Sequence, residues 1–259
     1  MFTILLHSSK TMRAGGSAVD YQSPLLLPKA VELATYVQSL SSADIATSMQ
    51  LSPKMAEKTH AMWQQWSTKP ADQLAAMDAF LGDIYSGLQV QTFSAADRLY
   101  ANEHLYILSG LYGVLRALDG IAPYRVEMGY RLPVEPYRNL YAFWGDDIAR
   151  TLPTSRTILN LSAVEYTKVM LPHLPGAEVI TPKFMTMNAS GKPVFVTVHA
   201  KVARGAFARW VIQNQVAEVA DLRNFTDLHY RCNASLSMPG QPVFVCKEFG
   251  GLGLSVRLT

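Results

Sequence analysis

The chain has 259 residues, of which 49% are hydrophobic and 17% charged, and it carries 23 basic against 20 acidic side chains. This length and apolar content are typical of a globular protein with a large core, and they exclude a disordered chain or a coiled coil. The sequence has no membrane-spanning apolar stretch, no basic region before its first apolar residues and only two cysteines. We therefore expect a soluble, cytoplasmic protein that forms a single domain over residues 1–259 and has no membrane partner.

Hydrophobic periodicity and turn residues predict strands and helices that alternate along the chain. In the first half we expect a strand over 2–7, a loop to 21, helices over 28–40, 44–49, 54–66 and 70–80, a loop over 81–93, a helix over 94–102 and a strand over 105–108. In the second half we expect a helix over 140–152, a strand over 157–161, a helix over 163–170, strands over 179–181 and 194–198, a helix over 199–213 and a strand over 242–246. Because the spacing of these elements is not that of regular βαβ units, the predicted fold class is α+β, a mixed α/β fold with helices flanking a mixed sheet.

Positive charge is concentrated in the C-terminal part of the chain. Residues 1–150 carry 12 basic and 14 acidic side chains, whereas residues 151–259 carry 11 basic and 6 acidic ones. The net charges are therefore −2 and +5, and no acidic residue occurs between Glu178 and Glu218. This asymmetry indicates an anionic partner, although a solvated basic face explains it equally well.

Common catalytic and metal-binding motifs are absent from the sequence. It contains no Walker-type loop G-x-x-x-x-G-K-[ST], no G-x-S-x-G elbow and no H-E-x-x-H motif. His229 and Cys232 form one closely spaced pair of zinc-ligand type, but a zinc site usually needs a second such pair. We therefore expect neither a metal site nor a bound cofactor.

A lysine flanked by hydroxyl groups follows the first predicted strand, in the sequence Ser9-Lys10-Thr11. Loops at strand ends often hold substrate or phosphate groups in mixed sheets. Lys10 could therefore bind an anion or, if desolvated, act as an amine nucleophile. The alternative is a surface lysine in a turn.

Two further segments indicate anion binding. In the glycine- and tyrosine-rich region from 80 to 129, Arg116 and Arg125 could clamp phosphates or bases, or could pair with acidic groups in packed loops. In the helix predicted over 199–213, Lys201 and Arg204 share one face and Arg209 lies just off it. Positive charge near a helix start opposes the helix dipole, which suggests a bound anion; a solvated stripe is the alternative.

These segments resemble the YaaA family of bacterial peroxide-stress proteins, from Met1 to about Phe244. The matching segments are 20–24 (DYQSP), 82–88 (GDIYSGL), 108–116 (LSGLYGVLR), 123–129 (PYRVEMG), 140–146 (LYAFWGD), 160–162 (NLS) with Glu165 and Tyr166, and 200–205 (AKVARG). The resemblance implies a mixed α/β fold with a basic cleft, a helix-hairpin-helix element, binding to DNA and a role in limiting iron-driven oxidative damage.

The resemblance also places the helix-hairpin-helix element within residues 43–66, with its hairpin at 51–54. In such elements backbone amides and a helix N-terminus meet a phosphate, and Lys54 would add positive charge. The chain departs from the family at the N-terminal loop, which usually reads S-P-x-K-T but here begins with His7 and Ser8. It also departs at Val202, where the family has a second lysine, and in the segment 229–235.

Two functions from different classes fit these observations. The first is a DNA-binding protein of the peroxide-stress response, in which a basic cleft contacts phosphates of duplex or branched DNA. The candidate anion-binding residues are Ser9, Lys10, Thr11, Lys54, Arg116, Arg125, Lys201, Arg204 and Arg209. We favour this function, and it predicts an open basic groove and affinity that falls steeply with salt.

The alternative is an enzyme that acts on a small nucleotide-like ligand, a nucleoside or a damaged DNA base, by N-glycosidic or lyase chemistry. Lys10 would then be the nucleophile or a phosphate ligand, with Asp83, Glu127 or Asp119 as its acid/base partner. Lysine and acid pairs of this kind occur in glycosylase/lyases that carry a helix-hairpin-helix element, which is an analogy. A deep pocket around Lys10 and Arg204 would favour this function. Direct iron binding is disfavoured, because no ligand pairs repeat at helical spacing.

Overall fold

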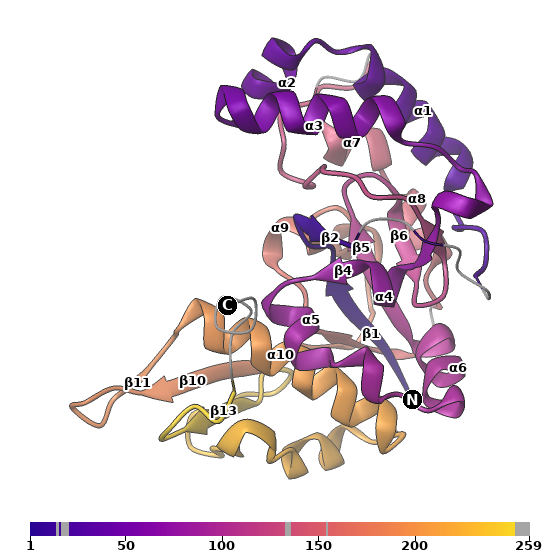
Figure 1. The fold of residues 1–259 in the computed structure, drawn as a ribbon. Coiled ribbons are helices and arrows are strands. Elements are labelled where there is room, and N and C mark those ends of the chain that lie inside the picture. The colour runs from indigo at the N-terminus through magenta and orange to yellow at the C-terminus, as the bar shows by residue number, and fades with distance from the viewer. Residues whose placement is uncertain (14–15, 17–20, 133–135, 154, 252–259) are drawn as a thin grey trace.

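The five-stranded sheet at the centre of the fold has the order β6-β5-β1-β8-β9 (Figure 1). The computed structural model describes residues 1–13, 16, 21–132, 136–153 and 155–251. The strands of this sheet are β1 (Phe2–His7), β5 (Leu105–Ser109), β6 (Gly113–Arg116), β8 (Thr157–Asn160) and β9 (Val179–Ile180). Only β6 runs antiparallel to its neighbour, so β1, β5 and β8 all end at the same edge. Every residue of β1 is buried, and four of its six residues are apolar.

A second, four-stranded sheet has the order β11-β10-β13-β12. It is formed by the C-terminal part of the chain and lies beside the helix α10 (Thr197–Gln213) (Figure 1). Its strands are β11 (Pro193–Val194), β10 (Lys183–Met187), β13 (Val243–Cys246) and β12 (Arg231–Cys232). Two short antiparallel pairs tie loops together: β2 (Thr11–Met12) with β4 (Phe80–Leu81), and β3 (Leu74–Ala75) with β7 (Gly120–Ile121). Parallel and antiparallel pairs together confirm the predicted α+β class.

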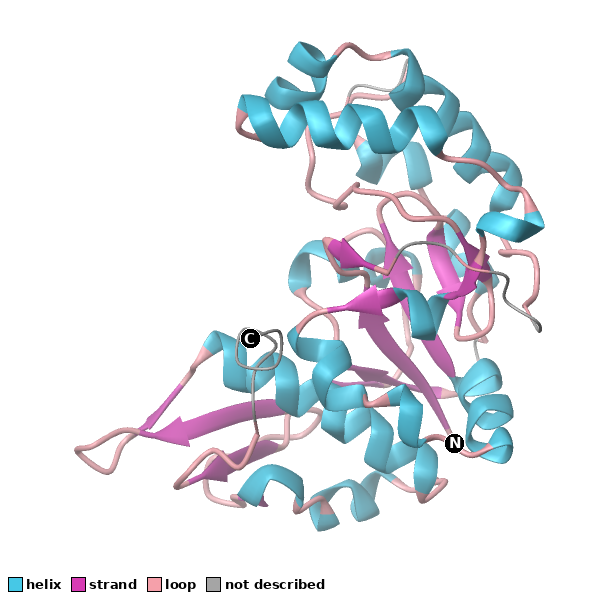
Figure 2. Ribbon diagram, viewed as in Figure 1, coloured by secondary structure: helices cyan, strands magenta, loops and turns pink. Residues whose placement is uncertain are grey.

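Helices α1 (Leu27–Ser39), α2 (Ser42–Met49), α3 (Pro53–Gln65) and α7 (Leu140–Trp144) gather at one end of the molecule, as Figure 2 shows in cyan. Ser41 and Asp44 form a capping box at the start of α2, which satisfies amides that the helix leaves unpaired. Gln50 ends α2 in the left-handed conformation, and α3 begins three residues later. The predicted pair of helices joined by a short turn is therefore present.

The other helices lie around the two sheets. They are α4 (Ala76–Ala79), α5 (Asp83–Leu88), α6 (Ala95–His104), α8 (Asp147–Thr151), α9 (Val164–Thr167) and α10 (Thr197–Gln213). Among the described residues, no helix is both long and apolar enough to cross a membrane. Asp20 and part of the loop predicted before residue 21 lie outside the described residues.

Several predicted elements differ from the structure, and each difference has a local cause. The single helix over 70–80 is wrong, because residues 74–75 pair with β7 and residues 80–81 pair with β2, leaving one turn of helix between them. The prediction of a loop over 81–93 is wrong, because this segment contains α5. The helix over 140–152 is interrupted at Gly145, whose φ of 52° breaks the helix between α7 and α8.

The ends of some elements in the C-terminal half also differ from those predicted. The strand expected over 194–198 stops at Val194, and α10 already begins at Thr197. The helix expected over 163–170 has regular α geometry only over Val164–Thr167. Strands β6, β10 and β12 were not predicted; β10 pairs with the distant β13, whereas β6 pairs with the preceding β5 and β12 with the following β13.

Two glycines allow α5 and α10 to cross with their backbones in contact. A Cβ atom on Gly87 would overlap the carbonyl oxygen of Val202, and one on Gly205 would overlap the carbonyl oxygen of Ile84. Because neither helix carries a side chain at the crossing point, their residues can line a common cavity. This crossing fixes Asp83 of α5 against the basic face of α10.

Candidate functional site

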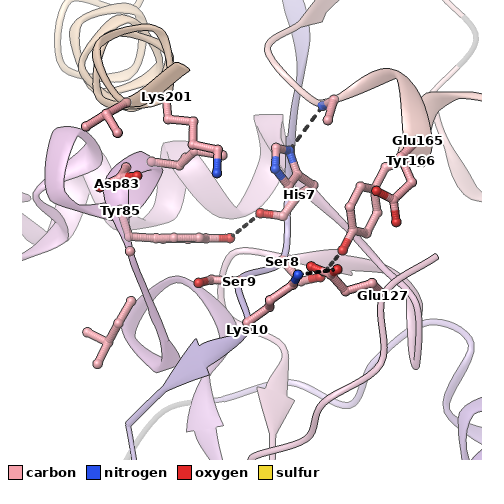
Figure 3. A pocket seen from close by; sticks show the side chains of 15 residues that line it. His7, Ser8, Ser9, Lys10, Asp83, Tyr85, Glu127, Glu165, Tyr166 and Lys201 are labelled. Carbon is pink, nitrogen blue, oxygen red and sulfur yellow. Dashed lines mark hydrogen bonds and ion pairs between the residues drawn. The ribbon is translucent and has the colours of Figure 1, made fainter. Parts of the chain in front are cut away.

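A cavity of about 730 Å³ lies where β1 and β8 end (Figure 3). Ligands of open α/β sheets commonly bind outside the carboxyl ends of parallel strands, and this volume is within the range of small-molecule sites. The lining residues come from β1 and its loop, from the start of α5, from the α9 region and from α10. They are His7, Ser8, Ser9, Lys10, Leu81, Gly82, Asp83, Ile84, Tyr85, Glu127, Ala163, Glu165, Tyr166, Val198 and Lys201.

His7, the last residue of β1, is held in one tautomer. Its Nδ1 accepts a hydrogen bond from the backbone amide of Ala163 at 3.1 Å, and the hydroxyl of Ser162 lies 3.3 Å from the same atom. Because an amide can only donate, Nδ1 carries no proton and the neutral ring carries its proton on Nε2. Burial, together with the charges of Arg204 and Lys201, lowers the pKa of His7 to about 3. His7 is therefore neutral near pH 7.

Neutral aromatic side chains surround His7. The Tyr166 ring stacks on the imidazole with its centroid 4.9 Å away, and the Tyr85 hydroxyl donates to the carbonyl oxygen of His7 at 3.0 Å. The Ser8 hydroxyl donates to the Tyr166 hydroxyl oxygen at 3.3 Å. Burial raises the pKa of Tyr85 and of Tyr166 well above the usual value. This wall is therefore uncharged and held by several contacts.

Lys10 and Glu127 form an ion pair at the cavity, with Nζ and Oε2 2.8 Å apart (Figure 3). The hydrogen bond that Lys10 donates to Glu127 raises the pKa of Lys10, although partial burial acts in the opposite direction. Lys10 is therefore protonated at neutral pH. Nucleophilic lysines need a lowered pKa, so this geometry suits an anion-binding cation better than an amine nucleophile.

Helix α10 supplies two cations to the opposite side of the site. Lys201 lines the cavity, and Arg204 follows one turn later, where burial lowers its pKa. Within the described part of the chain, neither side chain makes a hydrogen bond or an ion pair with another residue. Figure 3 shows Lys201 beside Asp83 and Tyr85, across the cavity from Lys10 and Glu127.

The structure therefore brings together Ser9, Lys10, Asp83, Glu127 and Lys201 from the predicted site residues, with Arg204 adjacent. Arg125 lies close enough to Lys10 for its charge to lower the Lys10 pKa, but it does not line the cavity.

The other predicted residues lie elsewhere. Thr11 is exposed on β2, and Lys54 is exposed at the start of α3, at the opposite end of the molecule from α10 (Figure 1). Arg116 pairs with the buried Asp119 at 2.7 Å, and Arg209 pairs with Asp227 at 2.8 Å. Asp119 is likewise outside the cavity. Arg116 and Arg209 therefore have internal partners, unlike Lys201 and Arg204.

Four titratable residues of the cavity were not chosen from the sequence as site residues: His7, Tyr85, Glu165 and Tyr166. Glu165 accepts a hydrogen bond from the Gly129 amide at 2.8 Å and so fixes the segment that carries Glu127. His7 ends β1, and residues 162–166 come shortly after β8; the carboxyl ends of these two parallel strands meet at one edge of the sheet. Their position at the ends of predicted strands could have identified these residues from the sequence. The position of Tyr85 could not be predicted in this way, because it depends on the crossing of α5 and α10.

The residues considered for zinc binding do not form a metal site in the described part of the chain, which contains no cluster of three or more His, Cys, Asp or Glu suited to a metal ion. Cys246 is buried and its Sγ donates to the Thr186 hydroxyl at 3.6 Å. His229 and Cys232 line a second cavity of about 780 Å³ on the smaller sheet. Of its two cationic residues, Arg231 donates to backbone carbonyl groups, and Lys247 lies beside Glu248 in the sequence.

The neutral state of His7 predicts a pH dependence of stability. A group whose folded pKa lies near 3 and whose unfolded pKa is 6.5 stabilises the fold above pH 6.5, and this stability is lost as the pH falls. Relative to His7→Phe, the wild-type protein should lose about 1.4 kcal/mol of unfolding free energy per pH unit below pH 6.5. Urea unfolding at about pH 7.5, 6 and 5 measures this difference.

The wild type must be compared with the variant because a second group also changes stability with pH. Burial raises the pKa of Asp119 to about 6, so Asp119 makes the fold more stable as the pH falls through 6, and it does so equally in both proteins. Replacing the exposed His173 by Phe is the matched control and should leave the wild-type pH dependence in place. Parallel pH profiles for the wild type and His7→Phe would contradict the prediction.

Comparisons with known proteins assign nearly the whole chain to one family. A family model described as "Peroxide stress protein YaaA" matches residues 2–236. A UPF0246 protein of Salinispora tropica is 51% identical over 258 residues, covering 98% of this chain and 97% of its own length. UPF0246 proteins of Burkholderia lata and Cupriavidus pinatubonensis are 39% and 36% identical, covering 84% and 88% of this chain and 87% and 94% of their own lengths.

Proposed function

This chain belongs to the family of the peroxide stress protein YaaA, and from that premise we propose that it binds DNA and receives one nucleotide unit in the cavity. One observation carries this proposal: Lys10, paired with Glu127, lies on one side and the unpaired Lys201 on the other side of a cavity of about 730 Å³ that is also lined by the buried ring of Tyr166. A nucleotide combines anionic oxygens with a flat, apolar base, and this site offers partners for both. A free small nucleotide is the simplest form of this ligand.

The pair α2–α3 is our candidate for sequence-independent contact with DNA. A short turn joins the two helices, and Lys54 and Lys58 are exposed on α3. Amides at such a turn, together with lysine side chains, can contact phosphates without reading the sequence. In this proposal the helix pair acts as the helix-hairpin-helix element and holds the DNA backbone, while the cavity receives an unpaired nucleotide.

Binding to DNA should fall steeply with salt, because lysine–phosphate contacts release counterions. Replacing Lys54 and Lys58 together by Ala should weaken binding of a duplex that contains an unpaired bubble. The slope of log affinity against log salt should decrease by about 2, one for each lost phosphate contact. Fluorescence anisotropy between about 50 and 200 mM salt gives this slope.

Lys183→Ala is the matched control for this measurement, since Lys183 is exposed on β10, away from α2 and α3 (Figure 1). It should leave the slope unchanged. Complete absence of DNA binding at low salt would contradict the proposed function itself. Binding with an unchanged slope in the double variant would remove only the helix pair from it.

A second candidate function, an enzyme acting on a damaged DNA base, is favoured by the cavity at Lys10, although the ion pair with Glu127 keeps Lys10 protonated until a base accepts its proton. If Glu127 accepted the proton of Lys10, the free amine could attack the aldehyde carbon of an abasic site and release water to form a Schiff base. Borohydride would reduce that imine to a stable covalent adduct. An adduct that forms in the wild type and disappears in Lys10→Ala would support lyase chemistry, and no adduct in either protein would exclude it.

A further inference from the structure

We propose that His7 determines ligand specificity by donating a hydrogen bond from Nε2 to an anionic oxygen, which Lys201 and Arg204 contact from the other side. The inference deepens the proposed function, on which it rests, because it identifies the group that the cavity recognises as a phosphate. The ligand class is then a phosphate-bearing nucleotide, free or within DNA, and not a nucleoside or a free base.

The first step of the argument is the orientation of the imidazole. The amide of Ala163 and the hydroxyl of Ser162 both lie at Nδ1, and the ring is stacked against Tyr166. These contacts fix which edge of the ring faces the cavity. Nε2 is the remaining nitrogen, and it must carry the proton because Nδ1 accepts from an amide. His7 therefore presents a donor to the cavity, which excludes it as a general base at Nε2.

The second step is the position of this donor relative to the cations. Figure 3 shows the second ring nitrogen of His7 on the edge that faces Lys201. His7 and Lys201 line the same cavity, Arg204 follows one turn after Lys201 on α10, and the charges of both cations lower the pKa of His7. An N–H group and an ammonium group that face each other need an acceptor between them, since two donors cannot bond each other.

The third step is the nature of that acceptor. Within the described residues, neither Lys201 nor Arg204 has an acidic partner, and burial penalises the charge of Arg204. A ligand with negative charge relieves this penalty, because charge-assisted hydrogen bonds to phosphate are the strong ones. A neutral imidazole adds a third donor without adding a third positive charge to the same buried region.

The test compares three probes by isothermal titration with the full chain: inorganic phosphate, deoxyadenosine 5′-monophosphate and deoxyadenosine. The wild type should bind the monophosphate more tightly than the nucleoside. His7→Phe keeps a flat ring against Tyr166 but has no donor, so it should bind the monophosphate about tenfold to a hundredfold more weakly. Its affinity for deoxyadenosine should not change.

Two further variants keep the inference falsifiable if His7→Phe does not fold. His7→Gln retains an N–H donor near the position of Nε2 and should bind the monophosphate within about threefold of the wild type. His7→Ser has a side chain too short to place a donor at the position of Nε2, and it should lose as much affinity as His7→Phe. Melting curves for all variants identify any that are unfolded.

A pH series separates this role from that of a charged histidine. Between about pH 7 and 8.5, affinity for the monophosphate should stay constant in the wild type, because a neutral donor does not titrate there. A protonated histidine would instead lose about tenfold in affinity per pH unit above its pKa. NMR of the imidazole nitrogens should show the Nε2–H tautomer, with Nε2 perturbed when phosphate is added.

The outcomes distinguish this inference from the proposed function. Wild-type protein that binds neither nucleotide nor DNA overturns the proposed function and this inference with it. Nucleotide binding that is unaffected by His7→Phe, or weakened equally for monophosphate and nucleoside, overturns only the role of His7. Binding that falls tenfold per unit above pH 7 also overturns the neutral-donor assignment.

Discussion

Adding a methyl group at Gly205 should destabilise the protein by about 3 kcal/mol or more, the largest effect that we expect from any single small substitution. The new Cβ would overlap the backbone carbonyl of Ile84 and lie 2.7 Å from the Leu88 amide nitrogen. Backbone atoms cannot rotate away, so α5 and α10 would have to separate. Alanine is intrinsically better than glycine in a helix by about 1 kcal/mol, so a net loss must come from the clash.

Urea unfolding of Gly205→Ala and of Gly87→Ala measures this effect, and both variants should also lose nucleotide binding, because the crossing positions Asp83 and Lys201. Gly191→Ala is the matched control, since no atom lies within 4 Å of the added Cβ and only its φ of 74° opposes the substitution. That control should lose about 1 kcal/mol. Equal losses for Gly205→Ala and Gly191→Ala would show that the helices do not cross in this way.

Replacing Asp119 by Ala should cost about 3 kcal/mol, because the substitution removes the partner of a partly buried guanidinium. The Asp119 carboxylate is fully buried and accepts hydrogen bonds from the Arg116 backbone amide at 2.8 Å and from Arg116 Nε at 2.9 Å. Burial raises the Asp119 pKa to about 6, so the carboxylate is ionised at pH 7.5 and depends on the guanidinium.

Urea unfolding at about pH 7.5 tests this, together with the double variant Asp119→Ala/Arg116→Ala, which should lose less than the sum of the two single variants. The exposed pair Arg150–Asp146 provides the control, and Asp146→Ala should change stability by less than about 1 kcal/mol. Nucleotide affinity of the folded Asp119→Ala variant should equal that of the wild type. A loss of nucleotide affinity without a loss of folding would instead indicate that Asp119 belongs to the functional site.

Elements whose formation depends on their own sequence were predictable. The consecutive apolar residues Ile4, Leu5 and Leu6 of β1 indicate a strand buried on both faces, and Ser41 and Ser94 each open a helix with a capping box. Elements that depend on distant partners were not. Residues 74–81 have a helical pattern, but pairing with β7 and β2 overrides it, and α5 contains a glycine that only its crossing with α10 explains.

The site was predictable to a similar degree. The position of Lys10 after the first strand and the acid-free segment around Lys201 correctly indicated two cations that line one cavity. Sequence could not tell which arginines have internal partners, because Asp119 binds Arg116 through a turn and Asp227 binds Arg209 across an irregular segment. His7 was read only as a difference from a family pattern, and its tautomer depends on Ala163, which follows a different strand.

A crystal structure of the protein bound to duplex DNA with an unpaired nucleotide tests the central claim most directly. We expect the unpaired nucleotide in the cavity between Lys10 and Lys201, with a phosphate oxygen within hydrogen-bond distance of His7 Nε2 and Lys201 Nζ. DNA bound wholly along α2 and α3, with its nucleotides outside the cavity, would contradict this account.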